Sequence, residues 1–454
     1  MKKIYIETIT PLLRGLTFDG EKGNIIIFED DLNKVSFALT PKNRKLLLSG
    51  RITPDQDRLC DSFPLYLKTI KNDLSFDKKH LEEKIIDYTV KKFQVYVEKY
   101  NQNPKVVIME NIGIFYLGVS YDDAINIKNN FEDILKNIID KYKTPEFRSY
   151  REKKNSKIIT NSSYDRSSEE YYNEKKIDRN NLVKNKIAVV TGGAQGFGES
   201  IVRELTKSEG LVFIADINIT GANQLAEELN IKYKRTTALP VKVDVTNENS
   251  VSEMIYEIVK KAGGIDIFIS NAGVLKAGSV KEMDLTTFNF VTNVNYMGYF
   301  LCTKHASKIM AIQNIPSKKY FTDIIQINSK SGLKGSNKNS AYAGSKFGSI
   351  GLTQSFALEL IDDNIKVNSI CPGNFFDGPL WADPDKGLFI QYLRTKKVPG
   401  AKTVEDVKRF YESKIPMKRG CTGKDLIKAI YYIIDQKYET GQAIPVTGGQ
   451  IMLK

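Results

Sequence analysis

KIAVVTGGAQGFGESIVRELTKSEGLVFIAD, residues 186–216, decides the fold of this chain. Its first apolar run, residues 186–190, has the composition of a buried strand, and a glycine-rich turn then opens a helical pattern from Ser200 to Ser208. Leu211–Ala215 is the next strand. Because strands alternate with helices from here to the C-terminus, we predict an α/β fold. Its core is a doubly wound parallel sheet, covered by helices on both faces.

The glycine-rich turn predicts a dinucleotide site. Gly192 permits a tight turn, Gly196 lets the backbone approach a pyrophosphate, and Gly198 lets the helix pack close to the sheet. The amides at the helix N-terminus would then face the phosphates. Gln195 and Phe197, which lie within the turn, complete the set that we expect to contact the cofactor.

Asp216 indicates which dinucleotide binds. It ends the second strand, eighteen residues after Gly198. A carboxylate at this point accepts hydrogen bonds from the ribose hydroxyls of the adenosine half and repels a 2′-phosphate, and the glycine turn contains no Arg or Lys to attract one. We therefore predict NAD in preference to NADP. Other cofactor contacts are expected at the carboxyl ends of strands, from Ile217, Asp244, Val245, Asn271, Ala272 and Gly273.

Tyr342 and Lys346 are the candidate proton-transfer pair. They are four residues apart, which places them on one face of a helix that starts near Ser340. An ammonium roughly 5 Å from the phenol contributes ~3 kcal/mol at an effective dielectric of about 20, which lowers the phenol pKa by about two units. Tyr342 would then act as a base towards an alcohol and as an acid towards a ketone.

Two further residues complete the predicted catalytic set. Ser329 lies thirteen residues before Tyr342, after another apolar run, and would donate a hydrogen bond to the substrate oxygen. Asn295 lies in the helix before that strand and could hold a water that connects Lys346 to solvent. The alternative for Asn295 is a structural one, as a helix kink or a partner of the backbone.

Residues from about 185 to 454 resemble the short-chain dehydrogenase/reductase family. The resemblance rests on T-G-x-x-x-G-x-G, N-A-G, the serine, Y-x-x-x-K, Pro372-Gly373 and the closing GQAIPVTGGQ. It implies a Rossmann fold, NAD(P), and catalysis by Asn295, Ser329, Tyr342 and Lys346. It also implies that residues after Pro372-Gly373 approach the nicotinamide amide, and that the chain forms a homodimer or homotetramer.

Within that family, IIQINSKSGLKGS, TQSFALEL and IPMKRGC resemble the sorbitol-6-phosphate 2-dehydrogenases. We therefore predict NAD-dependent, reversible oxidation of D-sorbitol 6-phosphate to D-fructose 6-phosphate. The alternative is another polyol or ketone. Predicted substrate residues are Ser329, Lys330 beside it, and Trp381 in a long segment, residues 375–421, that would form a lid. Further cations could bind the phosphate or belong to a solvated basic loop, namely Lys334, Arg394, Lys396, Lys397, Lys418 and Arg419.

The N-terminal part predicts a smaller α/β domain, residues 1–145, joined by a polar linker, residues 146–184, to the dehydrogenase domain, residues 185–454. Its expected strands are Asn24–Phe28, Lys45–Leu48 and Lys105–Met109. Its expected helices are Asp77–Tyr100 and Tyr121–Tyr142, the second with Ser120 as its cap.

Residues from about 40 to 142 resemble class II aldolase/adducin domains, through Thr53-Pro-Asp-Gln56 and residues 103–118. Active members bind zinc through several histidines. This half has only His80, and Gln56 stands where a histidine is expected, so we predict no metal site. The domain would serve assembly or stability, or alternatively sense a sugar phosphate and regulate the dehydrogenase.

Composition excludes other classes of function. The net charge of +13 is spread along the chain among acidic residues, which favours a solvated surface over nucleic-acid binding. No apolar run is long enough to span a bilayer, and the first residues do not read as a signal peptide. Four scattered cysteines suit a reducing compartment, so we expect a cytoplasmic protein without metal or membrane partners.

Overall fold

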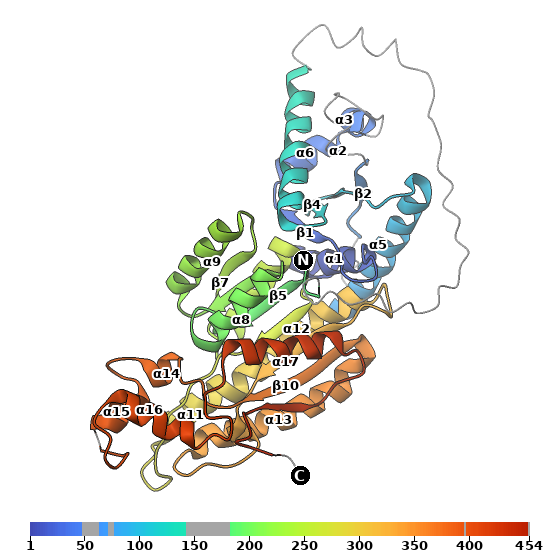
Figure 1. Ribbon diagram of the computed structural model, residues 1–454. Coiled ribbons are helices and arrows are strands. Elements are labelled where there is room, and N and C mark those ends of the chain that lie inside the picture. The colour runs from blue at the N-terminus through green and yellow to red at the C-terminus, as the bar shows by residue number, and fades with distance from the viewer. Residues whose placement is uncertain (48–62, 71–76, 142–181, 395, 453–454) are drawn as a thin grey trace, which may run out of the picture.

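The computed structural model describes residues 1–47, 63–70, 77–141, 182–394 and 396–452 (Figure 1). The predicted linker, residues 146–184, and the Thr53–Gln56 motif lie outside these ranges, apart from residues 182–184. In Figure 1 the N-terminal module lies above the dehydrogenase domain, and the N-terminus itself lies where the two meet.

The dehydrogenase domain is built on a parallel sheet of seven strands, which confirms the predicted Rossmann fold. The order is β11-β10-β9-β8-β5-β6-β7. The chain starts at β5, moves outward through β6 and β7, and then returns to place β8 on the other side of β5. The carboxyl ends of β5 and β8 therefore flank the point where ligands bind in such sheets. The strands are β5 (Ile187–Thr191), β6 (Leu211–Asp216), β7 (Ala238–Lys242), β8 (Ile267–Ser270), β9 (Thr322–Ile327), β10 (Ile365–Pro372) and β11 (Ala443–Val446).

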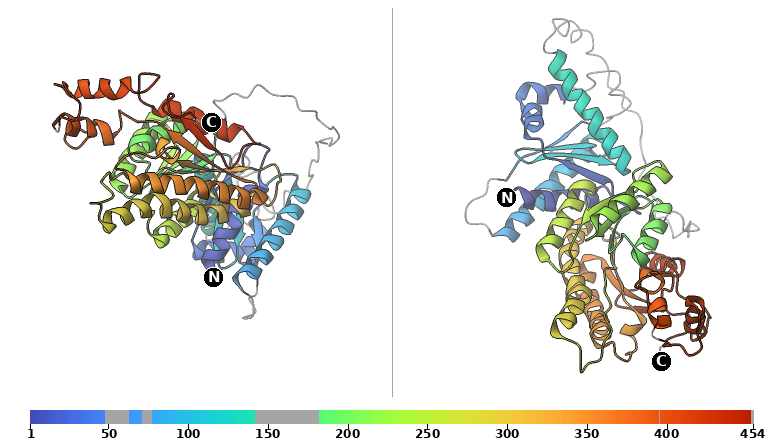
Figure 2. Two further views of the ribbon diagram at one scale, coloured as in Figure 1. Left: turned by 90° about the horizontal axis from the view of Figure 1, so that it is seen from below. Right: turned by 90° about the vertical axis from the view of Figure 1, so that its left-hand side faces the viewer.

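Helices cover both faces of this sheet, as Figure 2 shows. Alternate residues of β5 explain the two layers, because Ala188 and Val190 join one apolar cluster whereas Ile187 and Val189 join the other. The first face carries α8 (Gly196–Lys207), α9 (Ile219–Tyr233) and α17 (Gly423–Asp435). The second face carries α10 (Glu248–Ala262), α12 (Gly298–Asn314) and α13 (Ser340–Leu360), with α11 (Leu285–Thr292) leading into α12.

The segment after β10 that was predicted to form a lid has an apolar core of its own, and it is called the lid segment or lid below. It contains three short helices, α14 (Pro379–Ala382), α15 (Leu388–Arg394) and α16 (Val404–Ser413). Figure 2 shows that they stand away from the sheet. Their core consists of Phe376, Trp381, Phe389, Val398, Val407 and Ile415.

The N-terminal module contains a four-stranded sheet of order β1-β4-β3-β2, with only the β2–β3 pair parallel. Its strands are β1 (Ile25–Glu29), β2 (Leu65–Leu67), β3 (Val106–Met109) and β4 (Gly113–Gly118). Helices α2 (Leu32–Leu39), α3 (Pro41–Leu47) and α6 (Tyr121–Lys141) pack on one face. Helices α1 (Lys2–Leu16) and α5 (Lys78–Tyr100) pack on the other.

Several local predictions for this module are confirmed, and one is wrong. The strand at 24–28 and the two long helices are present, and the amide of Asp123 donates to Ser120 Oγ as the predicted cap requires. Of the expected strand Lys45–Leu48, residues 45–47 are instead the end of α3, and Leu48 lies outside the described residues. Pro41 occupies the first helical position, and Asn43 Nδ2 donates to the carbonyl of Phe37 at 2.9 Å.

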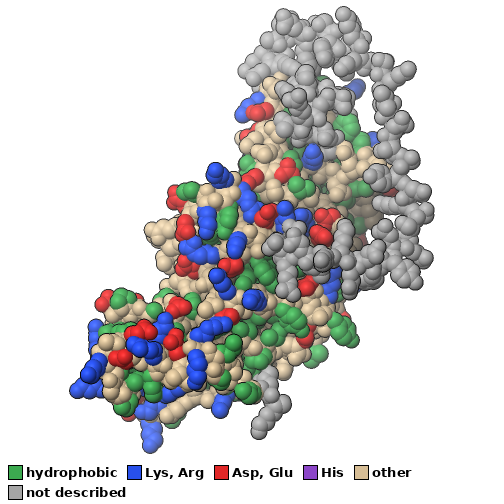
Figure 3. Space-filling model, in the orientation of Figure 1, with side chains coloured by type: hydrophobic (Ala, Val, Ile, Leu, Met, Phe, Trp, Pro, Cys, Tyr) green, Lys and Arg blue, Asp and Glu red, His purple; other side chains and the backbone are tan. Residues whose placement is uncertain are grey.

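None of the described helices is both long and apolar enough to cross a membrane. On the face drawn in Figure 3, Lys and Arg side chains are interspersed with Asp and Glu, as the dispersed charge of the sequence suggests.

Candidate active site

The glycine turn between β5 and α8 has the geometry of a phosphate-binding loop. Gly192 and Gly196 both adopt a φ of 62°, a left-handed conformation that favours glycine. A Cβ on Gly198 would lie 2.0 Å from the carbonyl oxygen of Gly192. The helix thus starts in direct contact with the turn, and its free amides open towards the end of β5. These residues fit a dinucleotide pyrophosphate.

Asn271 fixes the glycine turn to the end of β8. Its Nδ2 donates to the carbonyls of Thr191 and Gly192, both at 3.0 Å. The hydroxyl of Thr191 in turn accepts from the amides of Asn271 and Ala272. Asn271, Ala272 and Gly273 were expected to contact the cofactor. Asn271 also orders the glycine turn itself.

The predicted adenosine contacts lie along the same edge of the sheet. Asp216 is buried at the end of β6, and its carboxylate accepts from the amides of Ala194 and Asn218, each at 2.9 Å. Ile217 is 66% exposed beside it. At the end of β7, Asp244 accepts from the amide and hydroxyl of Thr246. The side chain of Val245 is buried against Gly298, where a Cβ would lie 2.9 Å from Val245 Cγ2.

Tyr342 and Lys346 lie on one face of α13, as predicted. Lys346 is almost fully buried, its Nζ donates to the carbonyl of Ile327 at 2.9 Å, and it lies 5.8 Å from the centre of the Tyr342 ring. Gly273 is close, because a Cβ there would lie 3.7 Å from that Nζ. The end of β8, the end of β9 and the first turns of α13 therefore meet at the lysine.

The pKa of Tyr342 departs from the prediction. Burial raises it above the usual value, and the hydrogen bond with Ser329 acts in the opposite direction. Burial also lowers the pKa of Lys346 to about 8. The predicted lowering of the phenol pKa by Lys346 is therefore wrong for this arrangement, because desolvation of the buried phenol outweighs the hydrogen bond with Ser329.

Ser329 is held next to Tyr342 by a residue that the sequence analysis did not single out. Asn328 is buried at the end of β9, and its Oδ1 accepts from the amide of Ser329 at 2.8 Å. Its Nδ2 donates to the carbonyl of Lys346 at 3.0 Å. One side chain thus connects Ser329 to the helix that carries Tyr342 and Lys346. The only signal in the sequence is a polar residue that ends an apolar strand.

Asn295 lies in a π-helical turn, residues 293–297, between α11 and α12. Its amide group accepts from the Val274 amide at 2.8 Å and donates to the Val274 carbonyl at 2.9 Å and to Ser345 Oγ at 3.2 Å. The side chain is therefore a partner of the loop backbone after β8, whereas the structural alternative was a helix kink or a partner of the helix backbone. The role in holding a water stays a prediction.

Comparison with known proteins agrees with this geometry. Residues 186–382 match the family model described as short chain dehydrogenase. The sorbitol-6-phosphate 2-dehydrogenase of Escherichia coli is 37% identical over 270 residues, which cover 59% of this chain and 99% of the relative. The chain belongs to the short-chain dehydrogenase family. An NAD(P)-dependent oxidoreductase activity follows for the domain that starts at β5.

Two further proteins resemble this short-chain dehydrogenase. The crystal structure of a sorbitol-6-phosphate 2-dehydrogenase from Erwinia amylovora is 38% identical with a TM-score of 0.54, and the match covers 59% of this chain and all of that one. An uncharacterized oxidoreductase of Bacillus subtilis, YuxG, is 26% identical over 464 residues, or 99% of this chain. The chain spans only 64% of that relative's length. The aldolase/adducin resemblance of the N-terminal module stays a prediction.

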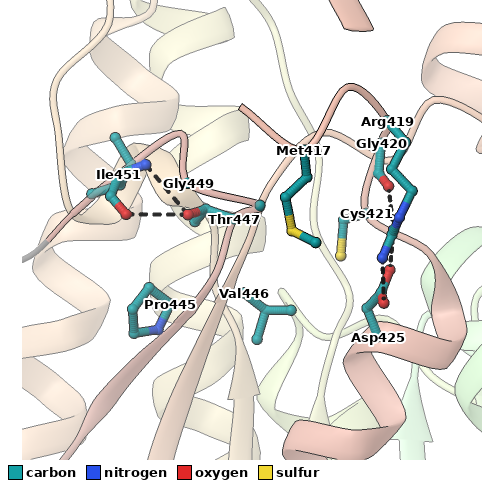
Figure 4. Close-up of a pocket in the computed structure, with 11 residues that line it drawn as sticks. Met417, Arg419, Gly420, Cys421, Asp425, Pro445, Val446, Thr447, Gly449 and Ile451 are labelled. Atoms are coloured by element: carbon teal, nitrogen blue, oxygen red, sulfur yellow. Dashed lines mark hydrogen bonds and ion pairs between the residues drawn. The ribbon is translucent and has the colours of Figure 1, made fainter. Parts of the chain in front are cut away.

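In this short-chain dehydrogenase, Pro372 and Gly373 end β10, next to the loop after β11. The Gly373 amide donates to the carbonyl of Val446 at 2.9 Å. A pocket of about 400 Å³ lies beside this loop, between Met417–Cys421 and Thr447–Gly449 (Figure 4). None of the four predicted catalytic residues lines it.

Most of the proposed phosphate-binding cations of the lid region have partners. The Arg419 guanidinium donates to both oxygens of Asp425, at 2.6 and 3.0 Å, as Figure 4 shows. Lys418 donates to the carbonyl of Ser413, and Lys397 lies 3.9 Å from the centre of the Tyr392 ring. Arg394 is similarly engaged, since it donates to the Asp385 carbonyl at 3.3 Å.

Trp381 is part of the lid core. It is only 9% exposed and packs against Phe376, Phe389 and Tyr411, with ring centres 4.9, 5.1 and 5.2 Å away. The sequence assigned it to the substrate site because it is the only tryptophan in a predicted lid. Its surroundings revise that assignment, because its ring supports the lid from within.

Within the described ranges, no group of three or more His, Cys, Asp or Glu side chains is arranged to hold a metal ion.

Proposed function

We propose that this chain oxidises a sugar-alcohol phosphate with NAD, most specifically D-sorbitol 6-phosphate at C2 to give D-fructose 6-phosphate. The observation that carries the proposal is Lys330, which sits directly after the catalytic serine in the short 3₁₀ turn that follows β9. The resemblance to sorbitol-6-phosphate 2-dehydrogenases, at 37% and 38% identity, supports the same substrate class.

Each residue of the site has a distinct role in the proposed reaction. Tyr342 takes the proton of the C2 hydroxyl, and Ser329 donates a hydrogen bond to the same oxygen as it becomes a carbonyl. Lys346 lies on the same helix face, with its Nζ 5.8 Å from the centre of the Tyr342 ring, and the bond of that Nζ to Ile327 fixes its position. NAD, when bound, supplies the acceptor for the hydride that leaves C2. In the reverse direction Tyr342 returns the proton.

Lys330 is the cation best placed for the phosphate. Its side chain is half-buried, and burial lowers the pKa of its ammonium. Among the described residues no carboxylate or carbonyl accepts from this ammonium, whereas Arg419, Lys418 and Arg394 have acceptors. A desolvated cation without a counter-charge gains most from a bound anion. We therefore propose Lys330 as the main phosphate contact.

Asp216 supports NAD over NADP. Each carboxylate oxygen accepts one backbone amide at 2.9 Å, so the negative charge is fixed at the end of β6. A 2′-phosphate brought to this position would meet that charge, whereas the free lone pairs can still accept ribose hydroxyls. Asp216→Asn is expected to raise the kcat/KM for NADP relative to NAD by at least 10-fold.

The test of the substrate compares sorbitol 6-phosphate with sorbitol in the parent, in Lys330→Met and in Lys396→Met. Lys396 is an exposed lid lysine and serves as the control. We expect Lys330→Met to reduce kcat/KM for the phosphorylated substrate by 10²-fold or more and to leave the low activity on sorbitol unchanged. Equal kcat/KM for the two substrates in the parent would refute the phosphate proposal.

The catalytic assignment has a separate test. Tyr342→Phe removes the proton acceptor and keeps the ring, so turnover should fall by at least 10³-fold while NAD binding, measured by calorimetry, is retained. An active Tyr342→Phe variant would refute the assignment, whatever the substrate.

We further propose a homo-oligomer, as family resemblance suggests. Helices α11, α12 and α13 and the π-helical turn between α11 and α12 expose large apolar side chains, Phe288, Phe290, Met297, Phe300, Phe347 and Leu358. Exposed apolar side chains that gather into a patch mark association surfaces. Light scattering should show a dimer or tetramer in the parent and a smaller species in Phe300→Glu.

A further inference from the structure

Helix α1 carries an arginine into the dehydrogenase domain. The side chain of Arg14 is completely buried, and its Nη2 forms an ion pair with Asp266, the residue just before β8. Its Nη1 donates to the carbonyls of Gly23 and Asn24, at 2.9 and 2.6 Å. The two charges belong to segments 252 residues apart. A buried arginine thus joins the two modules of the chain.

Asp266 also accepts hydrogen bonds from several groups in the core of the dehydrogenase domain. One carboxylate oxygen accepts from the amide of Ile187, the first residue of β5, at 2.6 Å. The other accepts from Tyr320 Oη at 2.6 Å and from Gln313 Nε2 at 3.0 Å. The Asp266 side chain, which pairs with Arg14, therefore also fixes the starts of β5 and β8 and the end of α12.

Around this ion pair the two modules are packed so closely that three glycines have no room for a side chain. A Cβ on Gly264 would lie 1.9 Å from Gln313 Oε1 and 3.0 Å from Arg14 Cδ. A Cβ on Gly15 would lie 2.0 Å from the Gln313 carbonyl, and one on Gly263 would lie 2.7 Å from the Ile26 side chain. At these three glycines, a larger residue would force neighbouring atoms to shift, so the close contact favours glycine.

Apolar packing is continuous across the same contact. One buried cluster contains Ile9 and Leu13 of α1 together with Ile258 of α10 and Met310 of α12. Helix α1 packs against both α10 and α12, and Figure 1 shows α1 beside α12. Beyond the end of α1, the ring of Phe18 stacks on Tyr320, with centres 4.3 Å apart.

We infer that the N-terminal module is a fixed internal partner of the α10–α12 face, and that it unfolds together with the dehydrogenase domain as one cooperative unit joined through Arg14 and Asp266. A module that moved as a sensor would have to separate this pair and expose the shared core. Removing one partner of a buried ion pair leaves the other charge uncompensated, which is strongly destabilising. The inference does not depend on the substrate.

Differential scanning calorimetry of the full chain tests the inference. We expect one transition in the parent, and a shift of that whole transition by about 3–5 °C to lower temperature in Arg14→Met. The matched control is Lys3→Met. Lys3 and Glu253 form an exposed pair, 3.3 Å apart, that joins the same two modules, and its loss should shift the transition by less than about 1 °C.

A double variant separates charge compensation from packing. Asp266→Asn leaves the Arg14 charge buried without its partner, so this single variant should melt below Arg14→Met. Adding Arg14→Met to Asp266→Asn removes that charge, and the double variant should melt above Asp266→Asn. A double variant less stable than both single variants would overturn the assigned role of the pair.

Hydrogen exchange of the parent provides a test that needs no variant. If the chain is one unit, amides of β1 and β4 should open with the same free energy as those of β5 and β8. Two calorimetric transitions in the parent, together with an N-terminal sheet that exchanges while the Rossmann sheet stays protected, would overturn the inference.

Discussion

Lys346 should give the chain a distinctive dependence of stability on pH. Burial lowers its pKa to about 8 in the folded state, from 10.5. Between these values the unfolded chain binds a proton that the folded chain does not, so stability rises with pH. From pH 7.5 to 9.5 the rise contributed by Lys346 is about 2 kcal/mol. Urea unfolding should show the parent gaining this amount over Lys346→Met, and a difference independent of pH would contradict the buried environment.

Asn271 should matter for cofactor binding although it need not touch the cofactor. Its Nδ2 makes the two bonds that join the glycine turn to β8. Asn271→Ala leaves the carbonyls of Thr191 and Gly192 without this donor, and the turn loses its fixed geometry. At about 1 kcal/mol for each bond, NAD affinity measured by calorimetry should fall by 10-fold or more. An unchanged dissociation constant would show that the turn is ordered without Asn271.

At the scale of residues, the sequence predicted which side chains lie close together but not how burial and hydrogen bonding change their pKa values. Tyr342 and Lys346 could be paired because helical spacing is local, and Asp216 could be placed because a strand ends there. The pKa of Tyr342 depends on its burial and on the hydrogen bond with Ser329, which lies thirteen residues earlier in the sequence. Neither effect can be predicted from a motif. Asn328 was missed for a similar reason, since the bond that joins it to the catalytic helix goes to the Lys346 carbonyl, eighteen residues away.

At the scale of elements, one helical glycine is required by its surroundings, whereas another can be replaced by alanine. Gly198 in α8 and Gly344 in α13 are both helical. A Cβ on Gly198 would collide with the Gly192 carbonyl and lie 2.7 Å from Asn271 Nδ2, whereas a Cβ on Gly344 meets nothing within 4 Å. Gly198→Ala should therefore lower the melting temperature and abolish NAD binding. Gly344→Ala should stabilise the chain by about 0.5–1 kcal/mol. Similar melting temperatures for the two variants would contradict this distinction.

The elements that the sequence identified correctly are those with a strong period or a motif at their ends. The strands of the Rossmann sheet are apolar runs, and α5 and α6 have regular apolar faces. Helix α1 was not expected because Thr8, Thr10 and Pro11 weaken its helical pattern. In the structure both threonine hydroxyls donate to the carbonyls four residues earlier, and tertiary packing stabilises the helix. Trp381 was misplaced because composition cannot distinguish a lid core from a ligand contact.

At the scale of the whole molecule, the sequence indicated two halves and a polar joint. The contact between the halves depends on Arg14 and Asp266, and no local pattern reveals that residues so far apart in the chain form a pair. A buried ion pair within a continuous apolar core makes the halves a permanent complex rather than two domains that share a chain. The covalent connection through residues 142–181 should then be dispensable once the chain has folded.

This expectation can be tested by introducing a protease site near residue 160 and cutting the folded protein. If the contact around Arg14 holds the modules together, the two fragments should elute as one species in gel filtration at about 10 µM, because a contact of this kind should reach a dissociation constant below about 1 µM. The same cut in Arg14→Met should release the fragments at a lower urea concentration, since Asp266 then lacks its partner. Fragments of the parent that separate in buffer would show that the chain connection, and not the buried contact, keeps the modules in place.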